Sequence, residues 1–333
     1  MGQIVITSIQ GPTGSVLAML DKATEAGFGI IVVGDRKTPA ADWPAGIRFV
    51  DIEEQQRLGY TLAALLPENH YARKNLGYLL TMSLGSQSIF DTDDDNAPLD
   101  NWRARSLTTP ARPCLCTGWI NTYRWFSDVH IWPRGLPLIH ARQNADLPAL
   151  GCASEVESPI QQGLANGSPD VDAVWRLVMD QDITFRDDAS LQLPDGAWCP
   201  FNSQSTWWFP SAYPLMYLPS FVSFRMTDIW RSFIAQRCLW AMGQTLVFHG
   251  PEMFQDRNPH NLLRDFEQEV SGYLDNDRIR EILEQTALAS GADAVSANLR
   301  LCYQALIQAG IIPDRELPLV DAWIADVELA SRP

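Results

Sequence analysis

Positive charge is scarce in this sequence. Its 333 residues include 25 Lys and Arg against 40 Asp and Glu, a formal net charge of −15 at pH 7. The basic residues are scattered and form no stripe of the kind that holds a nucleic-acid backbone, so we expect no nucleic-acid partner. A phosphate-bearing ligand would need local cations or a metal ion to offset the overall repulsion.

Paired cysteines and long apolar runs are also missing. The one close pair among six cysteines, Cys114 and Cys116, lacks the second pair and the histidine spacing of a structural zinc site. No apolar run reaches about 18 residues, and the N-terminus does not have the pattern of a signal peptide. We expect a reduced, cytoplasmic protein without a membrane span. The sequence leaves open whether it forms a homo-oligomer.

What is present is the composition of a folded domain, with 46% hydrophobic and 20% charged residues. Apolar runs typical of buried strands alternate with helical periodicity through about residue 100. The expected strands are 4–9, 29–33, a short run after Gly46, and 88–90; the expected helices are 13–26, 60–66 and 72–85. This alternation predicts an α/β fold with a Rossmann-like, mostly parallel sheet flanked by helices, and with ligands at the carboxyl ends of its strands.

The rest of the chain is less regular. Residues 102–219 are rich in Pro, Trp and turn residues, and we expect them to form the acceptor-side wall of a cleft. A helix is expected at 228–243, and two further helical stretches, at 259–269 and 277–309, predict a helical C-terminus.

An acidic cluster follows the fourth expected strand. In an extended segment, Asp91, Asp93 and Asp95 would point to one side and Asp94 to the other. Carboxylates suit Mg²⁺ or Mn²⁺, which can bridge the phosphates of a departing nucleoside diphosphate. The alternative is a solvated acidic turn. A second alternative is a calcium loop that lacks the Gly and distal Glu of an EF-hand.

Seven segments, in the same order over roughly residues 4–270, resemble the STELLO-type glycosyltransferases of plants and their bacterial relatives. They resemble more distantly the reversibly glycosylated polypeptides, which include UDP-arabinopyranose mutase. The segments are 34–39 (GDRKTP), 73–78 (RKNLGY), 89–94 (IFDTDD), 132–138 (WPRGLPL), 161–167 (QQGLANG), 169–172 (PDVD), and 217–220 (YLPS) through 228–231 (DIWR). The resemblance implies a GT-A glycosyltransferase fold. It assigns residues 1–100 to a nucleotide-sugar-binding half, 101–270 to an acceptor-side half and 271–333 to a C-terminal helical appendage.

The same resemblance implies roles for individual residues. The nucleotide sugar would lie against Thr7, Ser8, Asp35, Lys37, Arg73 and Asp94, with Arg73 near the phosphates, and the metal ion would bind Asp91, Asp93 and Asp95. Two of these residues have a structural alternative. Asp35 can stabilise the turn after Gly34, and Arg73 can be an ordinary cation on a helix surface.

Two residues are expected at the reacting centre. The resemblance implies that Asp228 is the base that removes the proton of the acceptor hydroxyl, and that Arg134 lies over the donor or acceptor. In the mutase-like relatives an arginine in this motif becomes glycosylated. The structural alternatives are a helix start stabilised by Asp228 and a rigid turn whose Arg134 stacks on an aromatic ring.

The sequence departs from the family pattern at a late histidine that could complete a metal site. The corresponding stretch, 252–259, reads EMFQDRNP, and His249 and His260 lie near it without matching its register. Either could be a third ligand or an ordinary core or surface residue. Aromatic residues could stack on sugars or pack between the two halves: Trp198, Trp207, Trp208 and Tyr213.

These features together predict a metal-dependent glycosyltransferase that uses Mn²⁺ or Mg²⁺. It would move a sugar from a nucleotide-sugar donor, a UDP-sugar, to a hydroxyl on a glycan or small-molecule acceptor, in bacterial surface polysaccharide synthesis. One alternative is a nucleotide-sugar mutase that interconverts ring forms through a glycosylated Arg134. Another is a non-catalytic scaffold with the same fold, which would have lost its acidic motif.

Overall fold

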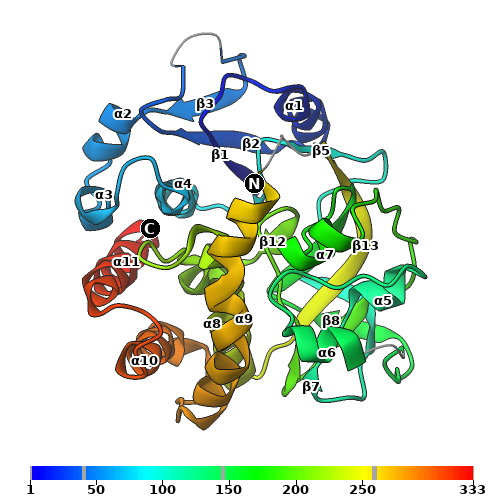
Figure 1. Ribbon diagram of the computed structural model, residues 1–333. Helices are drawn as coiled ribbons and strands as arrows, with labels where there is room; N and C mark the ends of the chain where they lie inside the picture. The colour runs from blue at the N-terminus through cyan, green and yellow to red at the C-terminus, as the bar shows by residue number, and fades with distance from the viewer. Residues whose placement is uncertain (1, 40–42, 144–146, 257–260, 333) are drawn as a thin grey trace.

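The computed structural model describes residues 2–39, 43–143, 147–256 and 261–332 (Figure 1). Its centre is one twisted sheet with the order β3-β2-β1-β4-β12-β9-β13-β10-β6-β8, and β5 pairs with β13. The strands are β1 (Gly2–Ser8), β2 (Gly29–Gly34), β3 (Ile47–Val50), β4 (Ser88–Asp91), β5 (Asn96–Pro98), β6 (Thr108–Pro113), β8 (Ser154–Glu157), β9 (Ile160–Gly167), β10 (Leu191–Leu193), β12 (Thr206–Trp208) and β13 (Leu246–Gln255). A small second sheet pairs β7 (Gly118–Trp119) with β11 (Ala197–Trp198).

Helices occur along the whole chain. They are α1 (Gly14–Ala26), α2 (Ile52–Arg57), α3 (Thr61–Leu65), α4 (Lys74–Ser83), α5 (Tyr123–Phe126), α6 (Leu138–Gln143), α7 (Ala173–Val178), α8 (Thr227–Ala241), α9 (Leu262–Gln285), α10 (Val295–Gln308) and α11 (Leu317–Ala330). Helices α1 and α4 pack on the strands of the first half. Short 3₁₀ turns include η1 (Tyr71–Arg73), η2 (Pro210–Met216) and η3 (Phe224–Met226). The α/β class that the sequence predicts is confirmed.

The first hundred residues fold as their periodicity predicts. The Thr13 hydroxyl caps α1 by accepting from the backbone N–H of Val16, and Gly27 ends the helix at a φ of 70°, which favours glycine. The first strand pairs in parallel with β2 and β4, and β2 pairs in parallel with β3. The carboxyl ends of β1, β2 and β4 therefore meet at one edge of the sheet.

The prediction of a mostly parallel sheet is corrected to a mixed one. Strand β12 runs antiparallel to both β4 and β9, and β9 runs parallel to β13. The sequence analysis missed β9, β12 and β13, because β9 carries Gly163 and two buried glutamines and β13 is bulged around Pro251. Because β12 is antiparallel to both of its neighbours, β9 and β13 run in the same direction as β4. Their carboxyl ends therefore lie at the same edge of the sheet as those of β1, β2 and β4.

The helical C-terminus is confirmed, but its limits differ from those expected. Helix α9 continues through residues 270–276 and ends at Gln285, where a single helix over 277–309 was expected. Helix α11 was not anticipated. Helix α11 packs on α3 and α4 in the first half of the chain, and Figure 1 draws it beside α3, whereas α9 and α10 pack on α8 and on one another. The Asp326 carboxylate accepts from the backbone N–H groups of Thr61 and Leu62, at 3.0 and 2.7 Å, and so caps the start of α3.

The tryptophan-rich stretch packs inside the protein. The side chains expected either to stack on sugars or to pack the interior are all buried: Trp198, Trp207, Trp208 and Tyr213. The Trp207 ring lies 4.5 Å from that of Phe90 and 5.6 Å from that of Trp102, measured between ring centroids. The packing alternative is therefore confirmed for these four residues.

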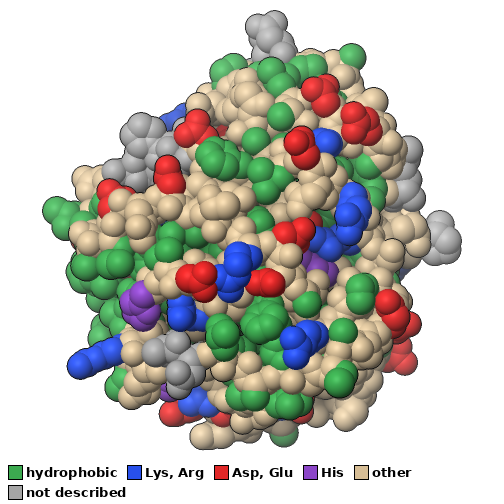
Figure 2. All heavy atoms as spheres, turned by 90° about the vertical axis from the view of Figure 1, so that its right-hand side faces the viewer, with side chains coloured by type: hydrophobic (Ala, Val, Ile, Leu, Met, Phe, Trp, Pro, Cys, Tyr) green, Lys and Arg blue, Asp and Glu red, His purple; other side chains and the backbone are tan. Residues whose placement is uncertain are grey.

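Neither a membrane-spanning helix nor a basic stripe is found on the part of the protein that the structure describes and Figure 2 draws. Within the described residues, no helix is long and apolar enough to cross a membrane. On the face drawn in Figure 2, the Lys and Arg side chains are scattered among acidic ones and form no basic stripe.

Candidate functional site

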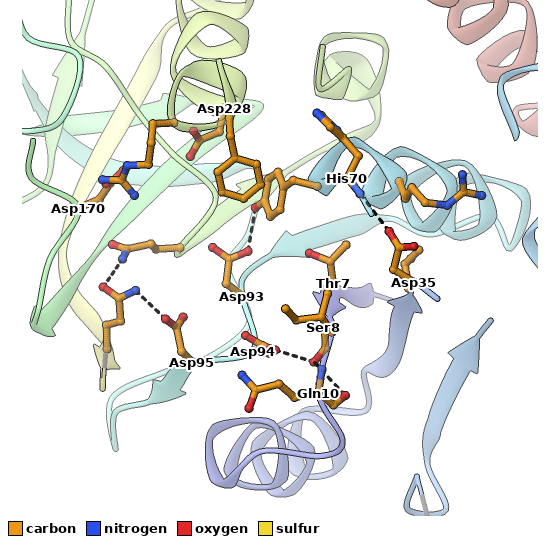
Figure 3. A pocket seen from close by; sticks show the side chains of 18 of the residues that line it. Thr7, Ser8, Gln10, Asp35, His70, Asp93, Asp94, Asp95, Asp170 and Asp228 are labelled. Atoms are coloured by element: carbon orange, nitrogen blue, oxygen red, sulfur yellow. Dashed lines mark hydrogen bonds between the residues drawn. The ribbon is translucent and has the colours of Figure 1, made fainter. Parts of the chain in front are cut away.

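A cavity of about 550 Å³ opens at the edge where the parallel strands end (Figure 3). Segments that follow β1, β2, β4 and β9, the last residue of β13, and the start of α8 all contribute to its wall. The charged and polar residues in this wall include Thr7, Ser8, Gln10, Asp35, Lys37, His70, Tyr71, Arg73, Asp93, Asp94, Asp95, Arg134, Asp170, Gln204, Arg225, Asp228 and Gln255. With the exception of Asp91, every site residue predicted from the sequence borders this one cavity.

One end of the cavity is built by the ends of β1 and β2. The Ser8 hydroxyl donates to the Asp94 carboxylate at 2.5 Å, which joins the first strand to the acidic segment. The Asp35 carboxylate accepts from the backbone N–H of His70 at 3.0 Å and from that of Arg36 at 2.7 Å. Asp35 thus stabilises its turn while bordering the cavity, so the two interpretations of this residue are compatible.

Arg73 is not a surface cation. It is 2% exposed and donates to the Gln55 side chain at 2.6 Å and to the Leu66 carbonyl at 3.2 Å. Burial lowers its pKa, although the neighbouring Asp35 acts in the opposite direction. Beside it, the Nδ1 atom of His70 accepts from the backbone N–H of Ala72, and burial lowers the pKa of this imidazole. His70 is therefore a neutral group.

The acidic segment does not alternate as an extended strand would. Strand β4 ends at Asp91, and the next residues turn, with the Asn96 N–H donating to the Asp93 carbonyl. As a result Asp93, Asp94 and Asp95 all border the cavity, while Asp91 is fully buried behind them. The prediction that Asp91 lies on the ligand side with Asp93 and Asp95 is corrected, and Asp94 joins that side.

Asp91 instead anchors two buried cations. Its carboxylate lies 2.7 Å from Lys74 Nζ and 3.0 Å from Arg231 Nη1, and all three side chains are fully buried. The Lys74 ammonium also donates to Asp93 at 3.0 Å and to the Thr92 carbonyl at 2.6 Å. Lys74 therefore connects the core to the floor of the cavity, and among the described residues Asp94 and Asp95 are left without a cationic partner.

The ionised forms of the acidic side chains in the cavity are disfavoured in the protein without a bound cation. Burial raises the pKa of Asp93 and that of Asp94. Burial and the charge of Asp93 raise the pKa of Asp95 to about 7. Within the described residues, no three His, Cys, Asp or Glu side chains converge as a ready-made metal site. Oxygen ligands with raised pKa values nonetheless suit a hard divalent cation, because such an ion would stabilise their ionised forms.

The opposite end of the cavity is organised around Arg134. Its guanidinium makes a bidentate pair with Asp170, at 2.7 and 2.8 Å, and contacts the Asp228 carboxylate at 3.0 and 3.1 Å. A third nitrogen donates to the Arg225 carbonyl. The segment does turn at Gly135, but among the described residues Arg134 stacks on no aromatic ring, and its bonds bring it together with Asp228 as predicted.

Asp228 lies in the first turn of α8, yet its carboxylate does not cap the helix. Burial would raise its pKa, but the charge and hydrogen bonds of Arg134 outweigh burial and hold the pKa below its usual range. Asp228 is therefore an ionised carboxylate that faces the cavity.

The sequence analysis gave no role to several residues of this site. Lys74 and Asp170 lie inside segments that carry the family resemblance, which was the available signal. Gln255 lies in the stretch that lacks the late histidine, and its Nε2 donates to Asp95 at 3.0 Å. Gln204 donates in turn to Gln255 at 2.6 Å. No local pattern marks these two amides, because they reach the cavity through the antiparallel part of the sheet.

The two histidines considered as metal ligands have different outcomes. His249 is 2% exposed and does not border the cavity. Its Nδ1 lies 2.7 Å from Ser190 Oγ and its Nε2 lies 3.0 Å from Gln161 Oε1, so both ring nitrogens are occupied. The interpretation of His249 as a core residue is confirmed. His260 lies outside the described residues.

We expect His249 to make the stability of the protein depend on pH. Burial and the charges of Arg105 and Arg103 lower the pKa of His249 well below its usual range. The unfolded chain takes up this proton as the pH falls through about 6.5 and the folded chain does not, so stability present above that pH is lost below it. Between pH 7 and 5 the unaltered protein should lose about 1–2 kcal/mol more than a His249→Gln variant in urea denaturation. The control is His130→Gln at an exposed position, which should lose as much stability as the unaltered protein. Equal losses for the unaltered protein and His249→Gln would show that His249 is not the source of the pH dependence.

Known proteins resemble this chain over much of its length. Residues 225–331, which include Arg225, Asp228 and Arg231, match the family described as STELLO glycosyltransferases. Over 269 residues, 74% of the chain, the sequence is 29% identical to the Arabidopsis thaliana protein Probable glycosyltransferase STELLO1. The identity to Probable glycosyltransferase STELLO2 from the same plant is also 29%, over 74% of the chain. The matched region spans about a third of each relative, 34% and 35% of their lengths.

Proposed function

Because this chain belongs to the STELLO glycosyltransferase family, we propose that it transfers a sugar from a nucleotide-sugar donor to an acceptor hydroxyl. The observation that carries the proposal is the order of groups along the cavity. In Figure 3, Asp35 and His70 lie at one end, Asp170 and Asp228 at the other, and Asp93, Asp94 and Asp95 between them. We propose that this sheet is a GT-A fold in which the three regions take the nucleoside, the diphosphate and the sugar.

The nucleoside would lie at the ends of β1 and β2. Thr7, Lys37 and the neutral His70 border that end, and Asp35 is held there by backbone N–H groups. Hydroxyl and carboxylate acceptors of this kind recognise a ribose, and we propose a uridine nucleotide as the donor.

The diphosphate would lie over Asp94 and Asp95. In so acidic a protein these carboxylates favour a phosphate only together with a cation, and Mg²⁺ commonly binds one or two carboxylates together with substrate phosphates. A Mg²⁺ or Mn²⁺ ion bound here would neutralise the charge that develops on the diphosphate as it leaves. The residues fit such an ion, because Asp95 has a pKa of about 7 and neither Asp94 nor Asp95 is paired with a cation among the described residues.

The sugar would be transferred beside Arg134. The acceptor oxygen attacks the anomeric carbon, its proton passes to a carboxylate, and the bond from that carbon to the phosphate oxygen breaks. Asp228 is ionised in the folded protein and can accept this proton, and Arg134 fixes its position. Asp170 is the second carboxylate at this end, and its bidentate contact fixes the guanidinium in turn.

The geometry favours transfer over the mutase alternative. A glycosylated arginine requires a neutral guanidine with a free lone pair. Burial of Arg134 acts in that direction, but Asp170 and Asp228 outweigh it and raise its pKa well above its ordinary value. We therefore expect no ring-isomerised nucleotide sugar when the protein and metal ion are incubated with the donor alone. Product chromatography checks this result, and isomer formation that is lost in Arg134→Lys would support a mutase instead.

A thermal-shift screen of nucleoside diphosphates and nucleotide sugars, with and without Mn²⁺, tests the proposed function. A ligand that binds only the folded state raises the apparent stability, by about 2.7 kcal/mol at a concentration of 100 times its dissociation constant. We expect the largest shift with a uridine nucleotide and a clear dependence on Mn²⁺. If no nucleotide raises the unfolding temperature, with or without Mn²⁺, the protein is not a nucleotide-sugar transferase, and a scaffold role is favoured.

A further inference from the structure

We propose that the end of the cavity around Arg134 accepts neutral sugars and excludes sugars that carry a carboxylate or phosphate. This inference rests on the proposed transferase function and adds the charge class of the sugar. It comes from the balance of charge among the described residues that border this end.

Among the described residues, the cation that lies between Asp170 and Asp228 is Arg134, and its charge is already neutralised. Each of the three guanidinium nitrogens of Arg134 donates: Nε and Nη2 to Asp170, Nη2 to Asp228, and Nη1 to the Arg225 carbonyl. Two carboxylates thus share one guanidinium. The cluster carries a net charge of about −1 when both carboxylates are ionised.

The neighbouring arginine does not change this balance. The Arg225 guanidinium lies 2.9 and 3.0 Å from the carboxylate of Glu269, a fully buried side chain, so its charge is compensated from behind. The remaining cations among the described wall residues are Lys37, which follows β2, and Arg73, which lies in η1. Lys37 is two residues from Asp35 along the chain and Arg73 is three residues from His70. Figure 3 draws Asp35 and His70 away from Asp170 and Asp228.

This arrangement treats hydroxyls and anions differently. A sugar hydroxyl can donate to the outer lone pairs of Asp170 and Asp228 without disturbing their contact with Arg134. A sugar carboxylate would meet a net negative charge among side chains that are only 6–11% exposed, where water screens weakly. It could pair with Arg134 only by displacing one of these carboxylates and leaving it buried without a partner.

The test compares donors that differ only at C6 of the sugar. Isothermal titration calorimetry in the presence of Mn²⁺ would measure the binding of UDP-glucose, UDP-glucuronate and the uncharged UDP-glucuronamide, or of the same sugars on the nucleotide that gives the largest thermal shift. We expect the glucuronate to bind at least about tenfold more weakly than the glucose donor. The amide, which has nearly the size of the acid, should regain most of that difference.

Each outcome bears on the inference. Equal or tighter binding of the glucuronate would overturn it, and an amide that binds as weakly as the acid would show that size, not charge, is selected. In Asp170→Asn, which removes one negative charge, the ratio of the two affinities should narrow, whereas the exposed Asp100→Asn should leave it unchanged. The unaltered protein carries the test if Asp170→Asn does not fold. If no nucleoside diphosphate binds, the transferase proposal itself fails, and the inference fails with it.

Discussion

Replacing Lys74 by Met is expected to destabilise the protein by about 3–5 kcal/mol. The ammonium of Lys74 is fully buried between the carboxylates of Asp91 and Asp93, at 2.7 and 3.0 Å. A methionine fills a similar volume. Among the described residues, it leaves the buried Asp91 with Arg231 as its only cationic partner and leaves Asp93 with none. Chemical denaturation monitored by tryptophan fluorescence would measure the loss.

The matching control is Lys22→Met on the surface of α1, which should change stability by no more than about 0.5 kcal/mol. Adding Asp91→Asn to Lys74→Met restores the balance of buried charge. The double variant should therefore be less destabilised than the sum of the two single variants. A Lys74→Met protein within about 1 kcal/mol of the original would show that Asp91 and Asp93 do not depend on this lysine.

Replacing Asp94 and Asp95 together by Asn is expected to lower the rate of metal-dependent sugar transfer by at least about 10²-fold. Neither of these cavity carboxylates has a cationic partner among the described residues, and they are the groups that we propose to hold the metal ion and the diphosphate. Removing two buried negative charges should leave the fold intact or stabilise it, since burial disfavours both ionised forms.

A loss of transfer with an unchanged unfolding transition would locate the effect at the site. The control is Asp100→Asn, an exposed carboxylate a few residues further on that does not border the cavity. Transfer should fall, and the increase in nucleotide affinity on adding Mn²⁺ should disappear, in the double variant alone. Retention of a Mn²⁺-dependent increase in that variant would require the metal ion to bind elsewhere.

Much of the first half of this fold could be predicted from the sequence, because its signals are local. The runs that became β1, β2 and β4 are apolar and short, and Thr13 and Gly27 mark the limits of α1. Parallel pairing then brings the ends of these strands to one edge. The approximate positions of Ser8, Asp35 and Asp94 in the site followed from that argument and from the family resemblance.

The rest of the site depends on contacts that local patterns do not encode. Whether Asp91 faces the cavity or the core depends on Lys74 in α4 and Arg231 in α8, which are far apart in the sequence but both contact Asp91. The alternation expected of an extended strand failed because the strand ends at this residue. Gln255 was also hidden, since its neighbourhood forms only when β12 and β9 insert between β4 and β13.

The cap that Asp326 places on α3 has a consequence for how the protein acquires its structure. The two hydrogen bonds join groups that lie 265 and 264 residues apart along the chain. The start of α3 therefore remains without these partners until the polypeptide has been synthesised through Asp326. Closing so long a loop costs entropy before its contacts form, so folding should be completed late and slowly. The start of α3 thus depends for its final consolidation on a helix that is synthesised some 265 residues later.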